Sequence, residues 1–379
     1  MQVLHVTAPS PLSWAYGGIP RAVRALVGAQ RAAGMHPRVW STDALDARRR
    51  ASSASALDGA PLTTTRTLSR RLAWAHQLYL PLGVPPSLAG VDLVHLHGHR
   101  HALNALAYRA ARAAGVPVVL TAHGTVPRLE RKVTLKRAWD LLVDGHVPTG
   151  ADAVVATSRA EARDLLACGV DGARIHRIPN ALTLSEFDDL PTRAEARARL
   201  GLGGGPLVVY LGQVTPRKRV DALAAAFDGE ALAPARLVVA GPARGMAVPA
   251  GVTHLGVLEG PARVDLLVAA DVLAYPSARE AFGLVPLEGL LCGTPVLVGD
   301  DCGCGELVAE AGAGLLVDGS VEGIRRAVRR LLDAPEDAAR MVARGRAWIA
   351  RHLAPAQVAE AHRELYRSVL ADPRTRARA

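Results

Sequence analysis

The sequence predicts an α/β fold built from two doubly wound parallel-sheet domains, and three observations support this prediction. Short apolar runs alternate with stretches of helical periodicity, which is the pattern of repeated βαβ units. Most of these runs are continuously apolar, as is typical of strands covered on both faces of a parallel sheet. The pattern breaks once, at the glycine-rich residues 201–206, and then resumes. A length of 379 residues also suits two domains.

The first half of the chain is predicted to form one domain, over residues 1–185. Its predicted strands are Val3–Thr7, Val39–Ser41, Leu93–Leu96, Val116–Thr121, Ala153–Thr157 and Ile175–Ile178. Its predicted helices are Pro20–Ala33, His101–Ala114 and Arg159–Cys168. Residues 47–71 are rich in Ser, Thr, Ala and Arg, so we expect a mobile loop there.

The second half repeats the pattern after a linker predicted over residues 186–205, which includes the helix Thr192–Leu200. The second domain is predicted over residues 206–350. Its predicted strands are Leu207–Leu211, Arg236–Ala240, Val252–Leu255, Val272–Tyr275, Pro295–Val298 and Gly314–Val317. Its predicted helices include Val220–Phe227, Ala262–Ala270 and Val321–Leu332, and a mostly helical tail follows that is broken at Pro355.

The chain is basic, with a formal net charge of +10 at pH 7. Two explanations stay open: a basic overall composition, or an anionic partner such as a membrane surface or a phosphorylated substrate. Nucleic acid is not expected as a partner, because the basic residues are not interleaved with stacking aromatic residues. The segment Leu72–Leu80, which follows Arg70 and Arg71, is either an element that docks on an anionic membrane or an ordinary surface helix.

Nothing in the sequence predicts secretion or a membrane span. No apolar run reaches the ~18 residues that a span needs, and the first residues lack the basic flank of a signal peptide. The cysteines form no C-x-x-C pair, so we expect reduced thiols at Cys168, Cys292, Cys302 and Cys304. We therefore expect a cytoplasmic protein, with peripheral attachment to the inner face of the membrane as an open alternative.

The most informative stretch is Tyr275–Val296, which reads YPSAREAFGLVPLEGLLCGTPV. Glu280 lies in a predicted loop, and Glu288 lies in the helix whose first turn suits Pro286. The N–H groups and the dipole at such a helix start favour an anion, and Gly283 allows close approach of the backbone. The stretch is suited to a ligand with a phosphate centre and hydroxylated ends, such as a nucleotide sugar. The alternative is that Glu288 merely complements the helix dipole and Glu280 is a solvated loop residue.

This stretch resembles the signature of the retaining glycosyltransferases of family 4, or glycosyl transferases group 1, which have the GT-B fold. The matching positions are Pro276, Ser277, Glu280, Phe282, Gly283, Leu284, Glu288, Gly293, Pro295 and Val296. A second segment, Tyr210–Asp221, resembles the family's G-R-L-x-x-x-K-G-x-D motif and places Lys218 at the basic position of that motif. Gln213 stands where the motif has arginine, and Gly289 stands where alanine is usual.

The resemblance implies two Rossmann-like domains that face each other across a cleft. It also implies that residues 351–379 form a C-terminal helix that returns to the first domain. It implies three catalytic residues, which are His123, Glu280 and Lys218. It implies a set of residues that bind the donor, namely Gly18, Gln213, Arg217, Lys218, Phe282, Gly283, Leu284 and Glu288.

The activity implied by the resemblance is transfer of a sugar from a nucleoside-diphosphate sugar to a hydroxyl acceptor, with retention at the anomeric carbon. No D-x-D triplet is present, so we expect no metal and no other cofactor, and positive groups must stabilise the departing diphosphate. Two alternatives stay open. One is a non-transferase enzyme of the same fold, such as a sugar-nucleotide epimerase, and the other is a catalytically weak protein that binds nucleotide sugars.

Overall fold

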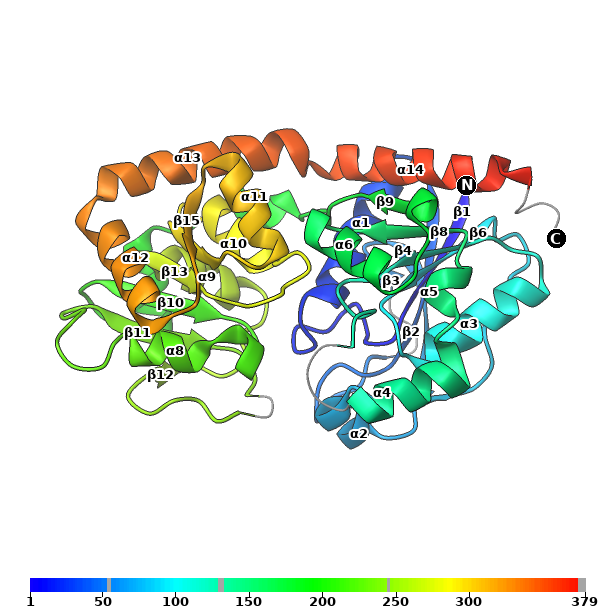
Figure 1. Cartoon of the computed structure of the whole chain (residues 1–379), viewed down its shortest axis with the longest axis horizontal. Helices are drawn as coiled ribbons and strands as arrows, with labels where there is room; N and C mark the ends of the chain where they lie inside the picture. Colours follow the sequence, from blue (N-terminus) through cyan, green and yellow to red (C-terminus); the bar gives the residue numbers. More distant parts are fainter. Residues whose placement is uncertain (53–55, 129–132, 244–245, 374–379) are drawn as a thin grey trace. The chain divides into compact units, whose positions relative to one another are not determined.

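The computed structural model describes residues 1–52, 56–128, 133–243 and 246–373. The chain divides into two compact units (Figure 1). The first unit holds Met1–Leu182 together with Pro355–Ala379, and the second holds Thr183–Ala354. Residues 374–379, the end of the predicted C-terminal segment, lie outside the described residues.

The first unit is built on a mostly parallel sheet. Over the described residues its strand order is β3-β4-β2-β1-β6-β7-β8-β9, and β5 pairs with β4. The strands are β1 (Gln2–Thr7), β2 (His36–Thr42), β3 (Ala56–Leu57), β4 (Ala60–Thr67), β5 (Pro81–Leu82), β6 (Leu93–His97), β7 (Val118–Thr121), β8 (Ala153–Ala156) and β9 (Ile175–Arg177). The pairs that β4 forms with β3 and β5 are antiparallel, and the other pairs are parallel.

Helices cover both faces of this sheet, as Figure 1 shows. They are α1 (Gly18–Ala32), α2 (Arg70–His76), α3 (Ala102–Ala113), α4 (Val133–Trp139), α5 (Val147–Gly150), α6 (Arg159–Ala167) and α14 (Pro355–Ala371). A π-helical turn over Asp140–Asp144 continues α4, and a 3-10 turn over Gly172–Arg174 precedes β9. The predicted α/β fold with parallel sheets is confirmed.

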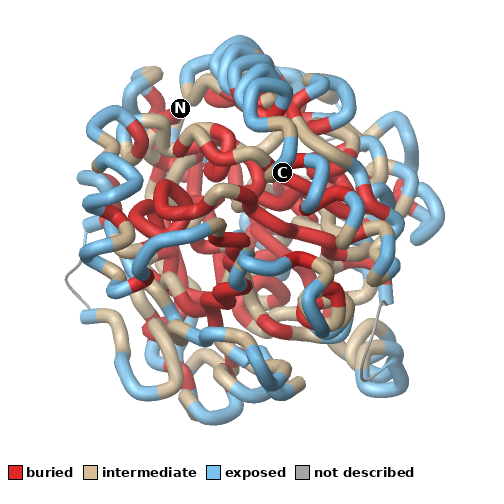
Figure 2. Tube along the Cα trace, turned by 90° about the vertical axis from the view of Figure 1, so that its left-hand side faces the viewer, coloured by how far each residue is buried: buried red, intermediate tan, exposed pale blue. Residues whose placement is uncertain are grey.

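Two apolar cores, one on each face, explain why the strands read as continuous apolar runs. Leu4 and Val6 of β1 belong to the core that includes Leu103 of α3. Val3 belongs to the other core, which includes Leu26 of α1 and residues of α14. Successive residues of a strand point to opposite faces, so a strand between two helix layers is apolar throughout. Figure 2 shows the buried segments in red, enclosed by exposed ones.

The prediction of a loop over residues 47–71 was wrong for Ala60–Thr67, the longest regular element of that stretch. Residues 60–67 form β4, which lies parallel to β2 with Val39 opposite Leu62. The Trp40 indole N–H donates a hydrogen bond to the Thr65 hydroxyl at 2.7 Å. The run of threonines explains the error, because polar β-branched residues favour a strand without giving an apolar pattern. Residues 53–55 lie outside the described residues.

The segment Leu72–Leu80 packs on the first unit through its aromatic residues, and several of its other residues are exposed. The helix α2 ends at His76, and Tyr79 is buried. The rings of Trp74 and Tyr79 contact the ring of Tyr16 edge-on, with centroid distances of 5.7 and 5.4 Å. Within the described residues, no helix combines the length and the apolar character that crossing a membrane requires.

The second unit contains a parallel sheet with the strand order β12-β11-β10-β13-β14-β15 over the described residues. The strands are β10 (Leu207–Leu211), β11 (Arg236–Ala240), β12 (Thr253–His254), β13 (Val272–Tyr275), β14 (Val296–Gly299) and β15 (Gly314–Val317). The helices are α7 (Arg193–Leu200), α8 (Val220–Ala225), α9 (Pro261–Ala269), α10 (Leu284–Leu291), α11 (Gly303–Ala311), α12 (Val321–Asp333) and α13 (Pro335–His352). Two 3-10 turns lie over Leu184–Phe187 and Pro216–Lys218.

Part of the stretch predicted as a linker, residues 186–205, is a packed helix of the second unit. Thr192 and Glu195 form a capping box at the start of α7. Arg197 of α7 donates to the Ala269 carbonyl at 2.9 Å and pairs with Asp271 at 2.8 Å. These contacts attach α7 to the end of α9 and to the residue before β13, so the helix belongs to this unit.

Candidate active site

A tight turn after β10 places Lys218 inside the second unit. Thr215 has extended backbone, Pro216 begins a single 3-10 turn, and Arg219 adopts a left-handed conformation before α8. Lys218 is buried, and its ammonium group donates to the Tyr275 hydroxyl at 2.7 Å. The same ammonium group forms an ion pair with the Glu280 carboxylate.

Glu280 is held near the end of β13 by two contacts of its carboxylate and one of its backbone carbonyl. The carboxylate accepts a hydrogen bond from Lys218, and the Tyr275 hydroxyl lies 3.4 Å from the same oxygen. The Glu280 carbonyl accepts from the Gly303 N–H at 2.6 Å, which ties the loop to the start of α11. Burial raises the pKa of Glu280, but Lys218 and Arg217 lower it further, so the net shift is downward. The carboxylate is therefore ionised at neutral pH.

Tyr275 is a member of this cluster that the sequence prediction did not include. Its phenol is fully buried, and burial together with Glu280 raises its pKa well above the usual value, so the hydroxyl stays neutral. The Lys218 ammonium group lies 4.8 Å from the Tyr275 ring centroid. The signal was present in the sequence, because Tyr275 is the last residue of a strand and directly precedes the motif.

Gln213 and Arg217 lie in the same loop as Lys218 and are partly buried. The Gln213 carbonyl accepts from the Tyr210 hydroxyl at 2.8 Å, and the Tyr210 ring stacks on the Tyr275 ring. The Arg217 carbonyl accepts from the N–H of Ala278 at 2.8 Å, which joins this loop to the loop of Glu280. The guanidinium of Arg217 and the ammonium of Lys218 therefore come from one short turn.

The start of α10 contains the other predicted donor-binding residues of this motif. Phe282 and Leu284 are buried, and Gly283 is the N-cap with φ 75°, a conformation that favours glycine. A Cβ at this position would lie 2.8 Å from the Cys304 sulfur, so no larger residue fits. Because the N-cap is a glycine, it contributes no side-chain hydrogen bond to the first turn of α10.

The structure places Glu288 in a different contact from Glu280. Glu288 is fully buried on α10, and its carboxylate accepts from the Arg263 guanidinium at 2.6 Å. Arg263 belongs to α9 and also pairs with Glu186. Sequence reasoning missed Arg263, although an arginine within an apolar helix requires a buried acidic partner.

Gly18 and His123 belong to the first unit. Gly18 is exposed and begins α1 after Gly17, whose φ is 88°. His123 follows β7 with φ 51°, and its Nε2 lies 3.2 Å from Nδ1 of His97. Burial, with a smaller contribution from His362, lowers the pKa of His123 to about 3, so the imidazole is neutral at pH 7.

Two groups of described side chains have metal-ligating atoms close to one another, and neither includes a predicted site residue. His99, Asp140 and Asp144 form one group. The Asp140 carboxylate already pairs with Arg100 and Arg128, at 2.7 Å in each case, so the two arginines compensate its charge without a metal ion. His5, His95 and His97 form the other group, and their nitrogens lie within 4.8 Å of one another.

Comparisons with known proteins identify the family of the chain. The family described as glycosyl transferases group 1 matches residues 192–348, and glycosyltransferase family 4 matches residues 16–186. A D-inositol 3-phosphate glycosyltransferase of Streptomyces griseus is 31% identical over 330 residues, which span 76% of this chain and 69% of the relative. One of Xylanimonas cellulosilytica is 33% identical over 262 residues, which span 60% of each chain.

Solved structures share the fold over nearly the whole chain. Sucrose-phosphate synthase from Thermosynechococcus elongatus superposes with a TM-score of 0.77 at 22% identity, covering 98% of this chain and 99% of that one. The Anabaena protein HepE in complex with UDP-glucose has a TM-score of 0.74 at 18% identity, covering 97% of this chain and all of that one. With the family matches over both halves and the Streptomyces relative, these likenesses show that the chain belongs to the family 4 glycosyltransferases, group 1, and has the GT-B fold.

Proposed function

We propose that this protein transfers a sugar from a nucleoside-diphosphate sugar to a hydroxyl group, with retention at the anomeric carbon. The observation that carries the proposal is the cluster of Lys218, Glu280 and Tyr275 at the ends of β10 and β13. Ligands of open α/β sheets bind at the carboxyl ends of the strands, which is where these side chains gather. HepE, of the same fold, is solved with UDP-glucose, which supports a donor of this class.

Each group of the cluster has a role in this proposal. The Lys218 ammonium group and the Arg217 guanidinium stabilise the negative charge that develops on the departing diphosphate. The ionised Glu280 carboxylate accepts hydrogen bonds from sugar hydroxyls, while Lys218 and Tyr275 align it by donating to it. When the donor binds, Lys218 must replace part of its contact with Glu280 by a contact with the phosphate. The ion pair of Lys218 and Glu280 is therefore formed before the donor binds and is partly broken by it.

The bond changes balance without a further reactant. The bond between the anomeric carbon and the diphosphate oxygen breaks, and a bond to the acceptor oxygen forms on the same face. The acceptor proton passes to the departing phosphate oxygen. In this proposal the start of α10 binds the sugar and the phosphate, and Glu288 binds the ribose hydroxyls. His123 and Gly18, which belong to the first unit, bind the donor. Positive side chains take the place of a metal ion.

A thermal-shift panel tests the proposal, with UDP-, GDP-, ADP- and dTDP-glucose as ligands. A donor at one hundred times its Kd adds about 2.7 kcal/mol to the stability of the folded state, because only that state binds it. We expect one nucleotide series to raise the melting temperature by roughly 5–10 °C. The Lys218→Met variant should lose most of this shift, and the Lys136→Met variant, changed in α4, should keep it.

A transfer assay then separates the proposal from its alternatives. The donor that shifts the melting temperature is supplied with radiolabel in its sugar, with D-inositol 3-phosphate as the first acceptor, because two relatives carry that acceptor in their names. Label in a new glycoside that forms equally well with EDTA supports metal-independent transfer. An epimerised donor would favour the epimerase alternative, and a shift without turnover would favour a binding protein.

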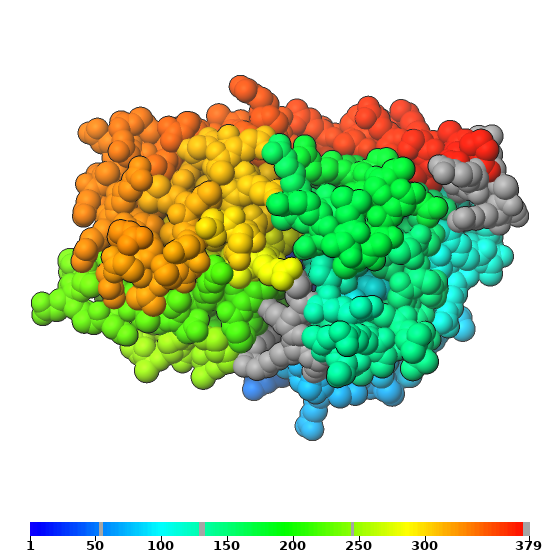
Figure 3. Space-filling view, in the orientation of Figure 1, coloured from blue at the N-terminus to red at the C-terminus, as the bar shows by residue number. Residues whose placement is uncertain are grey.

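We further propose a cytoplasmic protein that contacts an anionic membrane through the surface around α2, light blue in Figure 3. Four apolar side chains are exposed there beside the exposed Arg66 and Arg71: Leu68, Leu72, Leu82 and Val84. Apolar side chains next to basic ones are the pattern of an interfacial element.

Liposome flotation checks this contact. We expect the protein to float with vesicles of phosphatidylglycerol and not with phosphatidylcholine vesicles, and to lose flotation in the Leu82→Glu/Val84→Glu variant. These positions are preferable to Trp74, because Trp74 packs on Tyr16 and its removal would disturb the fold. Leu166→Glu, at an exposed leucine of α6, is the matched control. Equal flotation of both variants would contradict the proposed surface.

A further inference from the structure

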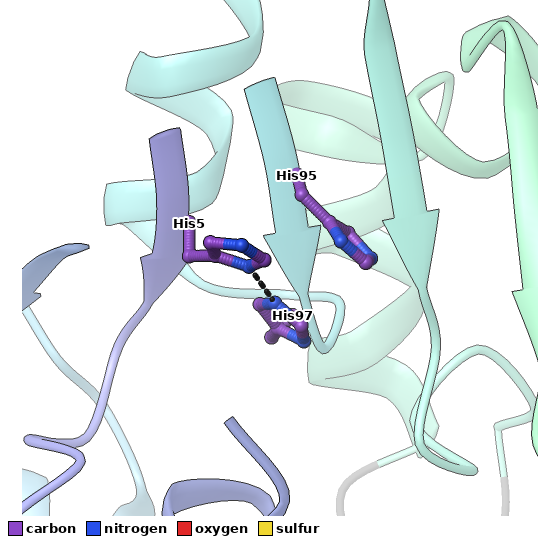
Figure 4. A group of neighbouring side chains, drawn as sticks. All are labelled: His5, His95 and His97. Carbon is purple, nitrogen blue, oxygen red and sulfur yellow. Dashed lines mark hydrogen bonds between the residues drawn. The ribbon is translucent and has the colours of Figure 1, made fainter. Parts of the chain in front are cut away.

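A continuous chain of hydrogen-bonded side chains crosses the interior of the first unit. Three of its histidines, His5, His95 and His97, lie on β1 and β6, as Figure 4 shows. Because strand residues alternate between faces, His5 lies on the same face of the sheet as Val3, which packs in the core with α1 and α14. Side chains from both helices complete the chain.

The contacts run in two directions from Gln30 of α1. On one side, Gln30 Oε1 lies 2.8 Å from His5 Nε2, His5 Nδ1 lies 3.0 Å from His97 Nε2, and His97 Nδ1 lies 3.2 Å from His123 Nε2. On the other side, Gln30 Nε2 donates to the Tyr366 hydroxyl at 3.0 Å. The same hydroxyl lies 2.6 Å from His95 Nδ1, and His95 Nε2 lies 2.7 Å from the Thr121 hydroxyl.

The three inner histidines suit these hydrogen bonds and not a shared cation. The rings of His95 and His97 are stacked, with centroids 4.3 Å apart and planes 29° from parallel. A ring nitrogen binds a metal ion through a lone pair in the plane of its ring, so two stacked rings do not converge on one ion. Both nitrogens of His5, His95 and His97 also already have a hydrogen-bond partner in the chain.

Each imidazole ring in this chain of hydrogen bonds carries a single N–H at neutral pH. Burial lowers the pKa of His5 to about 4 and of His123 to about 3, and it lowers the pKa values of His95 and His97 well below the usual value. A neutral imidazole donates from one nitrogen and accepts at the other. The direction of one hydrogen bond therefore determines the direction of all the bonds that follow it.

The amide of Gln30 is the asymmetric element of the chain, since one end accepts and the other donates. We propose that Gln30 is a positioning residue that sets the tautomer of His123 through His5 and His97. The Gln30 carbonyl accepts from His5 Nε2–H, so His5 Nδ1 accepts from His97 Nε2–H, and His97 Nδ1 accepts from His123 Nε2–H. His123 Nδ1 is thereby left as a hydrogen-bond acceptor.

Tyr366 holds the amide in this orientation. Its hydroxyl accepts from Gln30 Nε2–H and donates to His95 Nδ1, and His95 Nε2–H then donates to Thr121. A reversed amide would require every one of these groups to exchange its donor and acceptor roles. The orientation is thus a property of the whole chain, and α14 contributes to it although Tyr366 does not contact His123.

The tautomer matters for the group that His123 meets. His123, His97 and His362 line a small cavity of the first unit. The centre of a water molecule can move within about 10 Å³ of this cavity, so there is room for one water. Within the described residues, His362 Nε2 is buried without a hydrogen-bond partner, and its Nδ1 bonds the Val358 carbonyl. Two of the residues that line this cavity, His123 and His362, therefore each have an acceptor nitrogen, which suits a hydroxyl group or a water as the partner. The assignment of that hydroxyl to the donor sugar rests on the proposed function, whereas the tautomer does not.

Nuclear magnetic resonance of the whole protein labelled with ¹⁵N histidine tests the proposal without any substrate. The ¹⁵N shifts and couplings to ring protons distinguish a protonated from a bare ring nitrogen, and a His123→Asn variant assigns the signals. In the unsubstituted protein we expect His123 with Nε2 protonated and Nδ1 bare. The Gln30→Met variant keeps the size of the side chain and removes the asymmetric amide. The bare-Nδ1 share should then fall below about nine tenths, because the variant lacks the hydrogen bond of ordinary strength that selects this tautomer.

A second variant and a control keep the test decisive. Tyr366→Phe removes the hydroxyl that orients Gln30, and we expect the same loss of a single tautomer at His123. Gln2→Met makes the same chemical change at an exposed glutamine and should leave the His123 signals unchanged. A mixed or reversed tautomer in a folded Gln30→Met or Tyr366→Phe protein supports the proposal. His123 with Nδ1 protonated in the unsubstituted protein, or unchanged in both folded variants, overturns it, whatever the protein proves to transfer.

Discussion

Replacing Lys218 by methionine is expected to lower the turnover of sugar transfer by about 10²- to 10³-fold. The ammonium group is the buried cation of the candidate active site, and in our proposal it faces the charge that develops on the departing diphosphate. Methionine retains an unbranched apolar side chain and removes the charge together with the hydrogen bonds to Tyr275 and Glu280. The measurement is the rate of radiolabelled sugar transfer at saturating donor and acceptor.

The controls for this substitution must separate catalysis from folding. Without Lys218, the Glu280 carboxylate loses its main charge partner, and its pKa should rise towards that of a buried acid. The double variant Lys218→Met/Glu280→Gln removes this isolated charge, so it should regain the stability of the fold but not the activity. A Lys218→Met protein with a normal melting temperature and a turnover within threefold of the original would rule out the assigned role.

Replacing Arg263 by methionine is expected to lower the free energy of unfolding by about 3–5 kcal/mol. The Glu288 and Arg263 side chains are only 1% and 4% exposed, so the substitution leaves a charged carboxylate in the interior without its partner. Water cannot take the place of the guanidinium at this depth. Urea unfolding followed by circular dichroism measures the loss.

Two comparisons make this measurement specific. Arg193→Met removes an ion pair with Asp271 in which the arginine side chain is 49% exposed, and it should cost less than about 1 kcal/mol. The double variant Arg263→Met/Glu288→Leu replaces the buried pair by apolar side chains and should regain most of the stability. If Arg263→Met cost no more than Arg193→Met, Glu288 would not depend on this pair, and its charge would be available to a ligand without rearrangement.

Some elements were predictable from local chemistry. The strands Leu207–Leu211, Arg236–Ala240 and Val272–Tyr275 were predicted with the bounds that the structure has, because each is a short apolar run between clear breaks. The strand β4 was not predicted, because its threonines pair with β2 through contacts that only the folded sheet provides. The helix Thr192–Leu200 was predicted within the linker, but its packing was not, because it depends on Asp271, more than seventy positions further along the chain.

The candidate site divides in the same way. The motif around Glu280 and the position of Lys218 could be identified from spacing and resemblance, since both lie in short segments that carry their own turns. Their roles remain part of our proposal. The partner of Glu288 could not be predicted, because Arg263 comes from a different helix and is recognised only once both are buried together.

The sequence by itself determined the alternation of strands and helices, the division into two halves and the family, because apolar periodicity and motif spacing are local properties. The tertiary structure alone decided which charges share a burial site and in which direction buried hydrogen bonds run. Glu280 lies with Lys218 and Tyr275, and Glu288 lies with Arg263. His5 of one strand lies between His97 of another strand and Gln30 of a helix. These partners are required because a polar group that is buried without one destabilises the fold. The group is buried only after segments that are distant in the sequence have packed around it.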